Sequence, residues 1–165
     1  MLTKSLFPFA QVLLSDLDSA ALSLASENSQ LHAVDGIVRG DLLAWCRSSC
    51  VDIIIANPPY VDADNMRGLP AEYRHEPGLA LAGGEDGLDL VRVLLIDAAR
   101  ILRPTGLFIL EVGNSFEALD DLSEQLHPIW VELEQGGHGV AVFMAQDLAQ
   151  WALSEDTTNT VVSAK

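Results

Sequence analysis

Short runs of aliphatic residues alternate with segments of helical periodicity along most of the chain. Short apolar runs are typical of buried parallel strands, and apolar residues spaced by three or four are typical of helices that cover such strands. This alternation predicts an α/β fold with a mostly parallel sheet. Strands are expected at residues 11–15, 36–39, 51–56, 107–112, 129–133 and 140–144.

Helices are expected between these strands, at residues 18–28, 42–48, 86–102 and 115–125. The helix at 86–102 has the clearest pattern, and Pro104-Thr105-Gly106 is expected to end it. Its apolar stripe has helical spacing and consists of Leu88, Val91, Leu94, Leu95, Ala98 and Leu102. The last two strands are expected to form an antiparallel pair at the edge of the sheet, joined by a turn at 136–139.

Length and composition indicate one globular domain. The chain has 165 residues, of which 49% are hydrophobic and 20% charged, enough for a real core. We expect that domain at residues 1–150 and a flexible tail at 151–165, where small polar residues predominate. No apolar run approaches the roughly 18–20 residues of a membrane span, and residues 1–10 make a poor secretory signal. A cytoplasmic protein is therefore expected.

The tetrapeptide Asn57-Pro58-Pro59-Tyr60 directly follows the aliphatic strand at 51–56. Open α/β sheets bind ligands at the carboxyl ends of their strands. The tetrapeptide is the signature of methyltransferases that modify a nitrogen of a planar amide or of an exocyclic amine. A proline-rich exit from a strand is the alternative interpretation.

An amide nitrogen is a poor nucleophile, because its lone pair is delocalised, so catalysis must come from orientation. The Asn57 side-chain oxygen can accept one N–H of the target amide, and the backbone carbonyl of Pro58 can accept the other. Both hydrogen bonds strengthen as positive charge develops on nitrogen. The prolines hold that carbonyl rigidly, and Tyr60 can lie against the flat face of the substrate.

Two aspartates are candidates for a cofactor site. Asp16 ends the first expected strand and could accept hydrogen bonds from both hydroxyls of a ribose. Asp41 follows the next strand, where it could meet the edge of an adenine. Aspartates after strands also cap helices, which remains the alternative for each of them.

The acidic balance of the chain bears on its partner. The chain has 9 Lys and Arg against 24 Asp and Glu, a formal charge of −15. Proteins that bind phosphate backbones gather basic residues on one face, so a nucleic-acid substrate is disfavoured and a basic protein partner is favoured. Acidity that serves solubility alone is the alternative. Cys46 and Cys50 lack the spacing of a metal site, so no metal is expected.

These segments together resemble the HemK-type protein-glutamine methyltransferases, which use S-adenosylmethionine, from about Phe9 to Leu148. The resemblance implies a Rossmann-like methyltransferase fold. It assigns Asp16, Asp41, Leu42 and Asn57 to the cofactor, and Asn57, Pro58 and Tyr60 to catalysis. It assigns substrate binding to Pro58, Pro59, Tyr60 and Glu76.

The segments at 72–77 and 136–140 are most similar to one branch of that family. That branch methylates a glutamine of protein three of the large ribosomal subunit, whereas a sister branch modifies peptide-chain release factors. A ribosomal protein or a release factor is therefore the expected partner. The alternatives are a DNA or RNA amino-methyltransferase, which must flip a base, and an inactive remnant that acts only by association.

One departure from the family concerns its Gly-x-Gly-x-Gly loop. No glycine occurs before residue 36, so the loop and the strand that precedes it are lacking. The N-terminal helical domain of the family is lacking too, so the chain is expected to be a C-terminal part, with its activity in doubt. The missing strand would lie at the centre of the sheet. Its absence would leave two strand edges unpaired, which predicts self-association.

Overall fold

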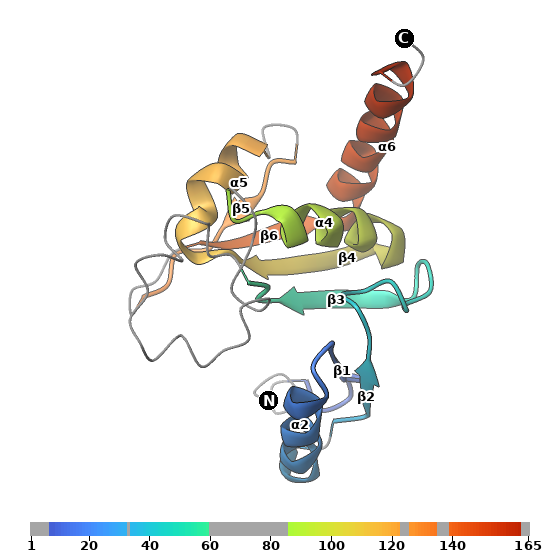
Figure 1. Cartoon of the computed structure of the whole chain (residues 1–165), viewed down its shortest axis with the longest axis vertical. Helices are drawn as coiled ribbons and strands as arrows, with labels where there is room; N and C mark the ends of the chain where they lie inside the picture. Colours follow the sequence, from blue (N-terminus) through green and yellow to red (C-terminus); the bar gives the residue numbers. More distant parts are fainter. Residues whose placement is uncertain (1–6, 33, 60–85, 123–125, 135–138, 163–165) are drawn as a thin grey trace. The chain divides into compact units, whose positions relative to one another are not determined.

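The computed structural model describes residues 7–32, 34–59, 86–122, 126–134 and 139–162 (Figure 1). Helices and strands alternate along the chain, which confirms the α/β fold class. The chain divides into two compact units, Met1–Cys46 and Arg47–Lys165, and each is described by itself. None of the described helices combines the length and the apolar character that crossing a bilayer requires.

The first unit is a β-α-β arrangement. It contains strand β1 (Leu13–Asp16), helix α2 (Ser19–His32) and strand β2 (Gly36–Arg39). The two strands pair in parallel, from Leu13 beside Gly36 to Asp16 beside Arg39. Parallel neighbours require a crossover connection, which α2 provides. The Asp18 carboxylate accepts a hydrogen bond from the Ala20 N–H at 3.0 Å, and so caps α2 as predicted.

The second unit contains a four-stranded mixed sheet in the order β3-β4-β6-β5. Strands β3 and β4 are parallel, whereas β4 pairs with β6, and β6 with β5, in antiparallel directions. The predicted antiparallel edge pair is thereby confirmed. The elements are β3 (Val51–Ala56), α4 (Asp89–Ile101), β4 (Leu102–Glu111), η3 (Gly113–Ser115), α5 (Phe116–Leu122), β5 (Ile129–Trp130), β6 (Val140–Met144) and α6 (Ala145–Val162).

One face of this sheet forms the core. Helices α4 and α6 contact each other and β4, and Figure 1 shows α4 running along the sheet. The Phe108 and Phe143 rings lie on neighbouring strands, with centroids 6.0 Å apart. Aromatic pairs of this kind add to the free energy gained from burial. The side chains buried in this core include Ile54, Val91, Leu94, Leu95, Ala98, Phe108, Leu110, Ala141, Phe143, Leu148 and Trp151.

The opposite face of the same sheet is also apolar. The strand register arranges its side chains in two rows, Ile53-Leu107-Met144 and Ile55-Ile109-Val142-Ile129. Ile53 is 48% exposed and Ile55 is 62% exposed. Strand β3 is an edge strand, and among the described residues no strand pairs with its second edge.

The expected helix at 42–48 is wrong, because the segment from Asp41 to Cys46 forms successive turns. The Ala44 N–H donates to the Asp41 carbonyl at 3.2 Å, and the Cys46 N–H donates to the Leu43 carbonyl at 2.9 Å. Leu42 has a φ of 44°, which a right-handed helix cannot accommodate. The Trp45 indole N–H donates to the Leu42 carbonyl at 3.1 Å and closes the turn.

The chain after residue 150 also differs from expectation. A flexible tail was predicted from residue 151, but helix α6 continues from Ala145 to Val162. Leu148 and Trp151 are buried and attach the first half of this helix to the core. The small polar residues after Leu153 gave no apolar pattern from which this helix could be predicted.

Candidate active site

Asn57 and Pro58 leave the sheet at the carboxyl end of β3. The Asn57 side chain is exposed, whereas Pro58 is buried and Pro59 is half-buried. Burial of the rigid Pro58 ring fixes the backbone next to it, while the carboxamide stays accessible to a substrate. The structure therefore places Asn57 as predicted, at the edge of a parallel sheet where ligands bind.

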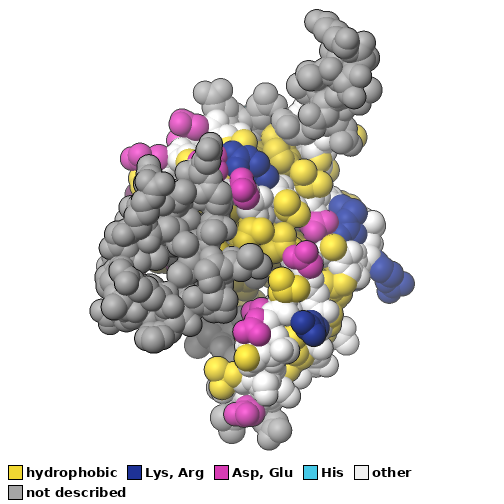
Figure 2. Space-filling model, in the orientation of Figure 1, with side chains coloured by type: hydrophobic (Ala, Val, Ile, Leu, Met, Phe, Trp, Pro, Cys, Tyr) yellow, Lys and Arg dark blue, Asp and Glu magenta, His cyan; other side chains and the backbone are white. Residues whose placement is uncertain are grey.

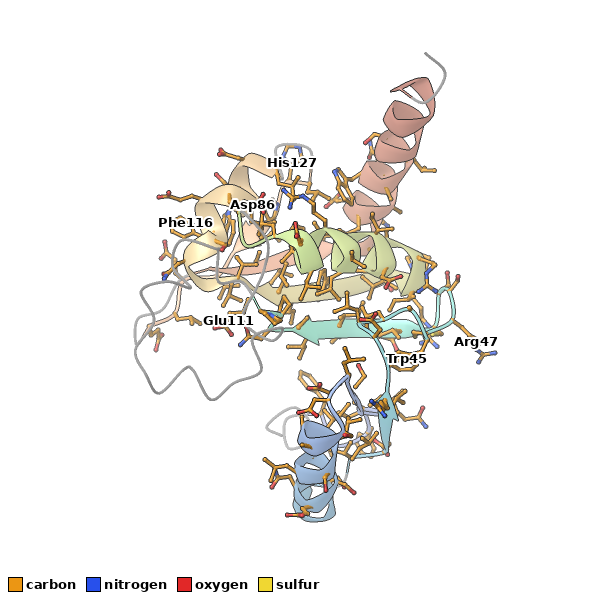
Figure 3. The ribbon with its side chains drawn as sticks, viewed as in Figure 1. Trp45, Arg47, Asp86, Glu111, Phe116 and His127 are labelled. Atoms are coloured by element: carbon orange, nitrogen blue, oxygen red, sulfur yellow. The ribbon has the colours of Figure 1, made fainter. Side chains whose placement is uncertain are left out.

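Glu111 lies beside this point, at the end of the neighbouring strand β4. Ala56 of β3 pairs with Leu110 of β4, so Asn57 and Glu111 are the next residues on the two parallel strands. Figure 3 shows Glu111 near the carboxyl end of β3. Its side chain is half-buried, and its backbone pairs with Val140 of β6.

Two glycines hold the turn that follows Glu111. The Val112 N–H donates to the Gly139 carbonyl at 2.7 Å. Gly113 has a φ of 48° and Gly139 a φ of 80°, a conformation that favours glycine. A Cβ atom on Gly139 would lie 2.3 Å from the Gly113 carbonyl oxygen, so the two backbones are in direct contact. This contact keeps the end of β4 in place.

An ion pair joins Asp86 to α4. One carboxylate oxygen of Asp86 accepts hydrogen bonds from the Leu88 N–H at 3.0 Å and from Arg92 Nη1 at 3.1 Å. The other accepts from Arg92 Nη2. The Arg92 guanidinium lowers the pKa of the Asp86 carboxyl, and Asp86 raises the pKa of Arg92. The charged pair fixes the backbone immediately before α4 (Figure 3).

Asp16 and Asp41 lie at the corresponding edge of the first unit. Asp16 ends β1, and the Gly40 N–H, next to Asp41, donates to the Asp16 carbonyl at 3.1 Å. One carboxylate oxygen of Asp16 accepts the Asp18 N–H at 2.8 Å, and Asp18 caps the helix instead. Asp16 is therefore not the residue that caps α2. Leu42 follows Asp41 in the left-handed conformation.

The predicted residues thus form two groups. Asp16, Asp41 and Leu42 lie together in the first unit, and Asn57, Pro58 and Pro59 lie together in the second. Tyr60 and Glu76 are outside the described residues. Among the described residues, no cluster of three or more His, Cys, Asp or Glu side chains has the arrangement of a metal site.

The position of Glu111 next to the end of β3 and the ion pair of Asp86 with Arg92 were not predicted from the sequence. Glu111 ends an aliphatic strand, as Asp16 does. That position in the sequence could have indicated Glu111 in the same way that it indicated Asp16. Asp86 and Arg92 are six residues apart, which is not a helical pair spacing, because Asp86 precedes the helix.

Comparison with known proteins identifies relatives over most of the chain. No family model matches. A ribosomal protein uL3 glutamine methyltransferase from Bradyrhizobium diazoefficiens is 43% identical over 145 residues, which are 86% of this chain and 46% of that protein. Proteins of the same name from Burkholderia pseudomallei and Bordetella pertussis are 39% and 36% identical, with 50% and 49% of their lengths covered. The chain spans about half the length of these curated relatives.

Solved structures of low sequence identity were also found. The PH0226 protein from Pyrococcus horikoshii is 17% identical, with a TM-score of 0.44, over 92% of this chain and 65% of that one. A TehB-like SAM-dependent methyltransferase from Corynebacterium glutamicum is 18% identical, with a TM-score of 0.43, over 81% of this chain and 67% of that one.

Proposed function

We propose that this chain belongs to the HemK-type protein-glutamine methyltransferases and takes part in methyl transfer to a protein glutamine, because it is similar to ribosomal protein uL3 glutamine methyltransferases over about half of their length. The cofactor proposed is S-adenosylmethionine, and the substrate is a ribosomal protein of the cytoplasm. The observation that carries the proposal is the position of Asn57 and Pro58, with an exposed carboxamide next to a buried proline at the carboxyl end of β3.

The chain's own residues would orient the target amide. The Asn57 side-chain oxygen and the Pro58 backbone carbonyl would each accept one N–H of the glutamine side chain. As the nitrogen becomes positive in the transition state, both acceptors bind it more tightly than they bind the ground state. Tyr60, Pro59 and Glu76 are proposed to contact the same substrate.

The first unit fits the ribose of the cofactor. Asp16 ends β1 and Asp41 comes shortly after the neighbouring parallel strand β2. The Asp16 carboxylate is proposed to accept hydrogen bonds from the ribose hydroxyls, and Asp41 is proposed to meet the edge of the adenine. The bound cofactor would supply the electrophilic methyl group. Leu42 is proposed to lie on the adenine side, with its backbone in the left-handed conformation.

The charge of the chain supports a basic protein as the substrate. A formal charge of −15 attracts a basic partner and repels a nucleic-acid backbone. The few Lys and Arg side chains visible in Figure 2 are separated from one another, unlike a phosphate-binding patch. This disfavours the DNA or RNA amino-methyltransferase. A release factor is the second candidate for the substrate.

Calorimetric titration with S-adenosylmethionine tests the cofactor site. We expect Asp16→Asn to weaken binding by at least about tenfold, because a charged acceptor for the ribose is lost. The amide oxygen of asparagine can still accept the Asp18 N–H, so local structure should persist. Asp121→Asn, at an exposed position of α5, is the control. Absence of binding to the parent chain at millimolar cofactor would favour the inactive remnant.

We further propose that the chain self-associates through the open edge of β3. Ile53 and Ile55 are exposed on this edge strand, and unpaired apolar edges associate. In sedimentation velocity experiments, Ile55→Lys is expected to shift the chain towards the monomer, because the lysine charge opposes pairing. Ile96→Lys, at an exposed position of α4, serves as the control. Equal sedimentation of all three proteins at every concentration would contradict the proposal.

A further inference from the structure

We propose that Glu111 is a positioning residue that orients the carboxamide of Asn57, an inference that rests on the proposed function. An asparagine side chain can turn its oxygen or its NH2 group towards a substrate, and the two arrangements have almost the same shape. Only the oxygen can accept an N–H of a target amide. A second group must therefore hold the NH2 end, and Glu111 is placed to accept it.

The strand register brings the two residues level with each other. Ile55 pairs with Ile109 and Ala56 with Leu110, so one further step along both strands reaches Asn57 and Glu111. Neighbouring strands lie about 4.8 Å apart. Asn57 and Glu111 directly follow the last paired residues of the two strands, so rotation of their side chains can bring the carboxylate and the carboxamide together.

The alternation along β4 assigns Glu111 to the open face of the sheet. Phe108 and Leu110 are buried against the helices, whereas Leu107, Ile109 and Glu111 are half-buried on the opposite side. Ile55 of β3 belongs to that side too, and Asn57 follows it by two residues. Residues two positions apart on a strand lie on the same face of the sheet. If the alternation of β3 continues from Ile55 to Asn57, the side chains of Asn57 and Glu111 lie on one side.

The backbone under Glu111 is unusually well fixed. Glu111 pairs with Val140, and Val112 donates to the Gly139 carbonyl at 2.7 Å. The backbones of Gly113 and Gly139 lie so close that a Cβ atom on Gly139 would clash with Gly113. A positioning group must itself be held in place, and this turn supplies the support.

The chemistry of the carboxylate then selects one orientation of Asn57. An ionised carboxylate has only acceptors, so it attracts the NH2 end of the carboxamide and repels the oxygen. A hydrogen bond from this NH2 group to Glu111 would direct the oxygen of Asn57 away from Glu111, towards the incoming substrate. Hydrogen bonds to charged groups are stronger than neutral ones, so the preference is substantial.

Solvent exchange of the Asn57 side-chain NH2 protons, measured by NMR, tests the proposal without requiring activity. Asn57→Ala identifies the signals by their disappearance. In Glu111→Leu, which has no acceptor, we expect exchange to be faster by at least about tenfold. Glu111→Gln keeps one acceptor oxygen and should give an intermediate rate. Glu117→Gln, at an exposed position of α5, should leave the rate unchanged.

Methyl transfer provides a second readout. If the chain transfers methyl groups, Glu111→Leu should lower kcat while the Kd for the cofactor stays constant, and Glu111→Gln should restore part of kcat. Unchanged NH2 exchange in Glu111→Leu would overturn the proposal. A different result would separate the two proposals. If Glu111→Leu exchanges faster than the parent chain, but the parent does not bind S-adenosylmethionine, the orienting role of Glu111 stands and the proposed function is refuted.

Discussion

Replacement of Asn57 by alanine is expected to lower methyl transfer to a glutamine-containing ribosomal protein by roughly 10²–10³-fold. The side-chain oxygen is one of two acceptors for the target amide, and its hydrogen bond is strongest in the transition state. The affinity for S-adenosylmethionine should change only a few-fold, because the proposed contacts with the ribose and the adenine come from Asp16 and Asp41. Transfer of a radioactive methyl group at saturating cofactor measures the first effect, and calorimetry measures the second.

Asn28→Ala, at an exposed position of α2, is the matched control and should keep the parent rate. Survival of turnover in Asn57→Ala would show that the carboxamide has no catalytic role. A parent chain that binds the cofactor and transfers no methyl group would contradict the proposed activity of the chain itself, separately from the role of Asn57.

Gly139→Ala is expected to destabilise the second unit severely. The φ of 80° alone costs a residue with a side chain roughly 1–3 kcal/mol. The new Cβ would also lie 2.3 Å from the Gly113 carbonyl oxygen and 2.7 Å from its nitrogen. Both atoms belong to the backbone, so the clash can be relieved only by moving the ends of β4 and β6. Urea unfolding should show a lower midpoint, with a larger decrease than the φ cost alone would give.

Gly36→Ala is the matched control for this prediction. The Cβ atom there would meet only the end of the flexible Leu13 side chain, at 2.7 Å, and Gly36 lies in β2. Its unfolding midpoint should therefore change little. An unfolding midpoint in Gly139→Ala equal to that of the parent would mean that the two turns do not depend on their close contact.

Local patterns were sufficient for several elements. The strands at 36–39, 51–56 and 140–144 have the boundaries that were expected, because polar residues mark the two ends of each short aliphatic run. The capping role of Asp18 was also predictable, since a cap acts on the next few residues of the same segment. The position of Asn57 after β3 follows from the same local reasoning.

The segment at 42–48 shows where local reasoning failed. Its composition suits a helix, but Leu42 adopts a φ of 44° and the following hydrogen bonds close turns. The indole of Trp45 donates to the Leu42 carbonyl and stabilises this arrangement. Helix propensity is a weak prior that such contacts override. The extent of α6 was missed for a similar reason, because burial of Leu148 and Trp151 outweighs the polar residues that follow.

The sequence by itself determined the α/β class, most of the strands and the position of Asn57 and Pro58 directly after β3, since these depend on residues close together in the chain. Only the tertiary structure decided which strands are neighbours and in what register. That register ends with Ala56 beside Leu110, so that Asn57 and Glu111 follow directly, and it assembles an apolar face from four strands; the fold also brings Gly113 against Gly139. Such pairings depend on packing between distant segments, about which the local pattern of apolar and polar residues carries no information.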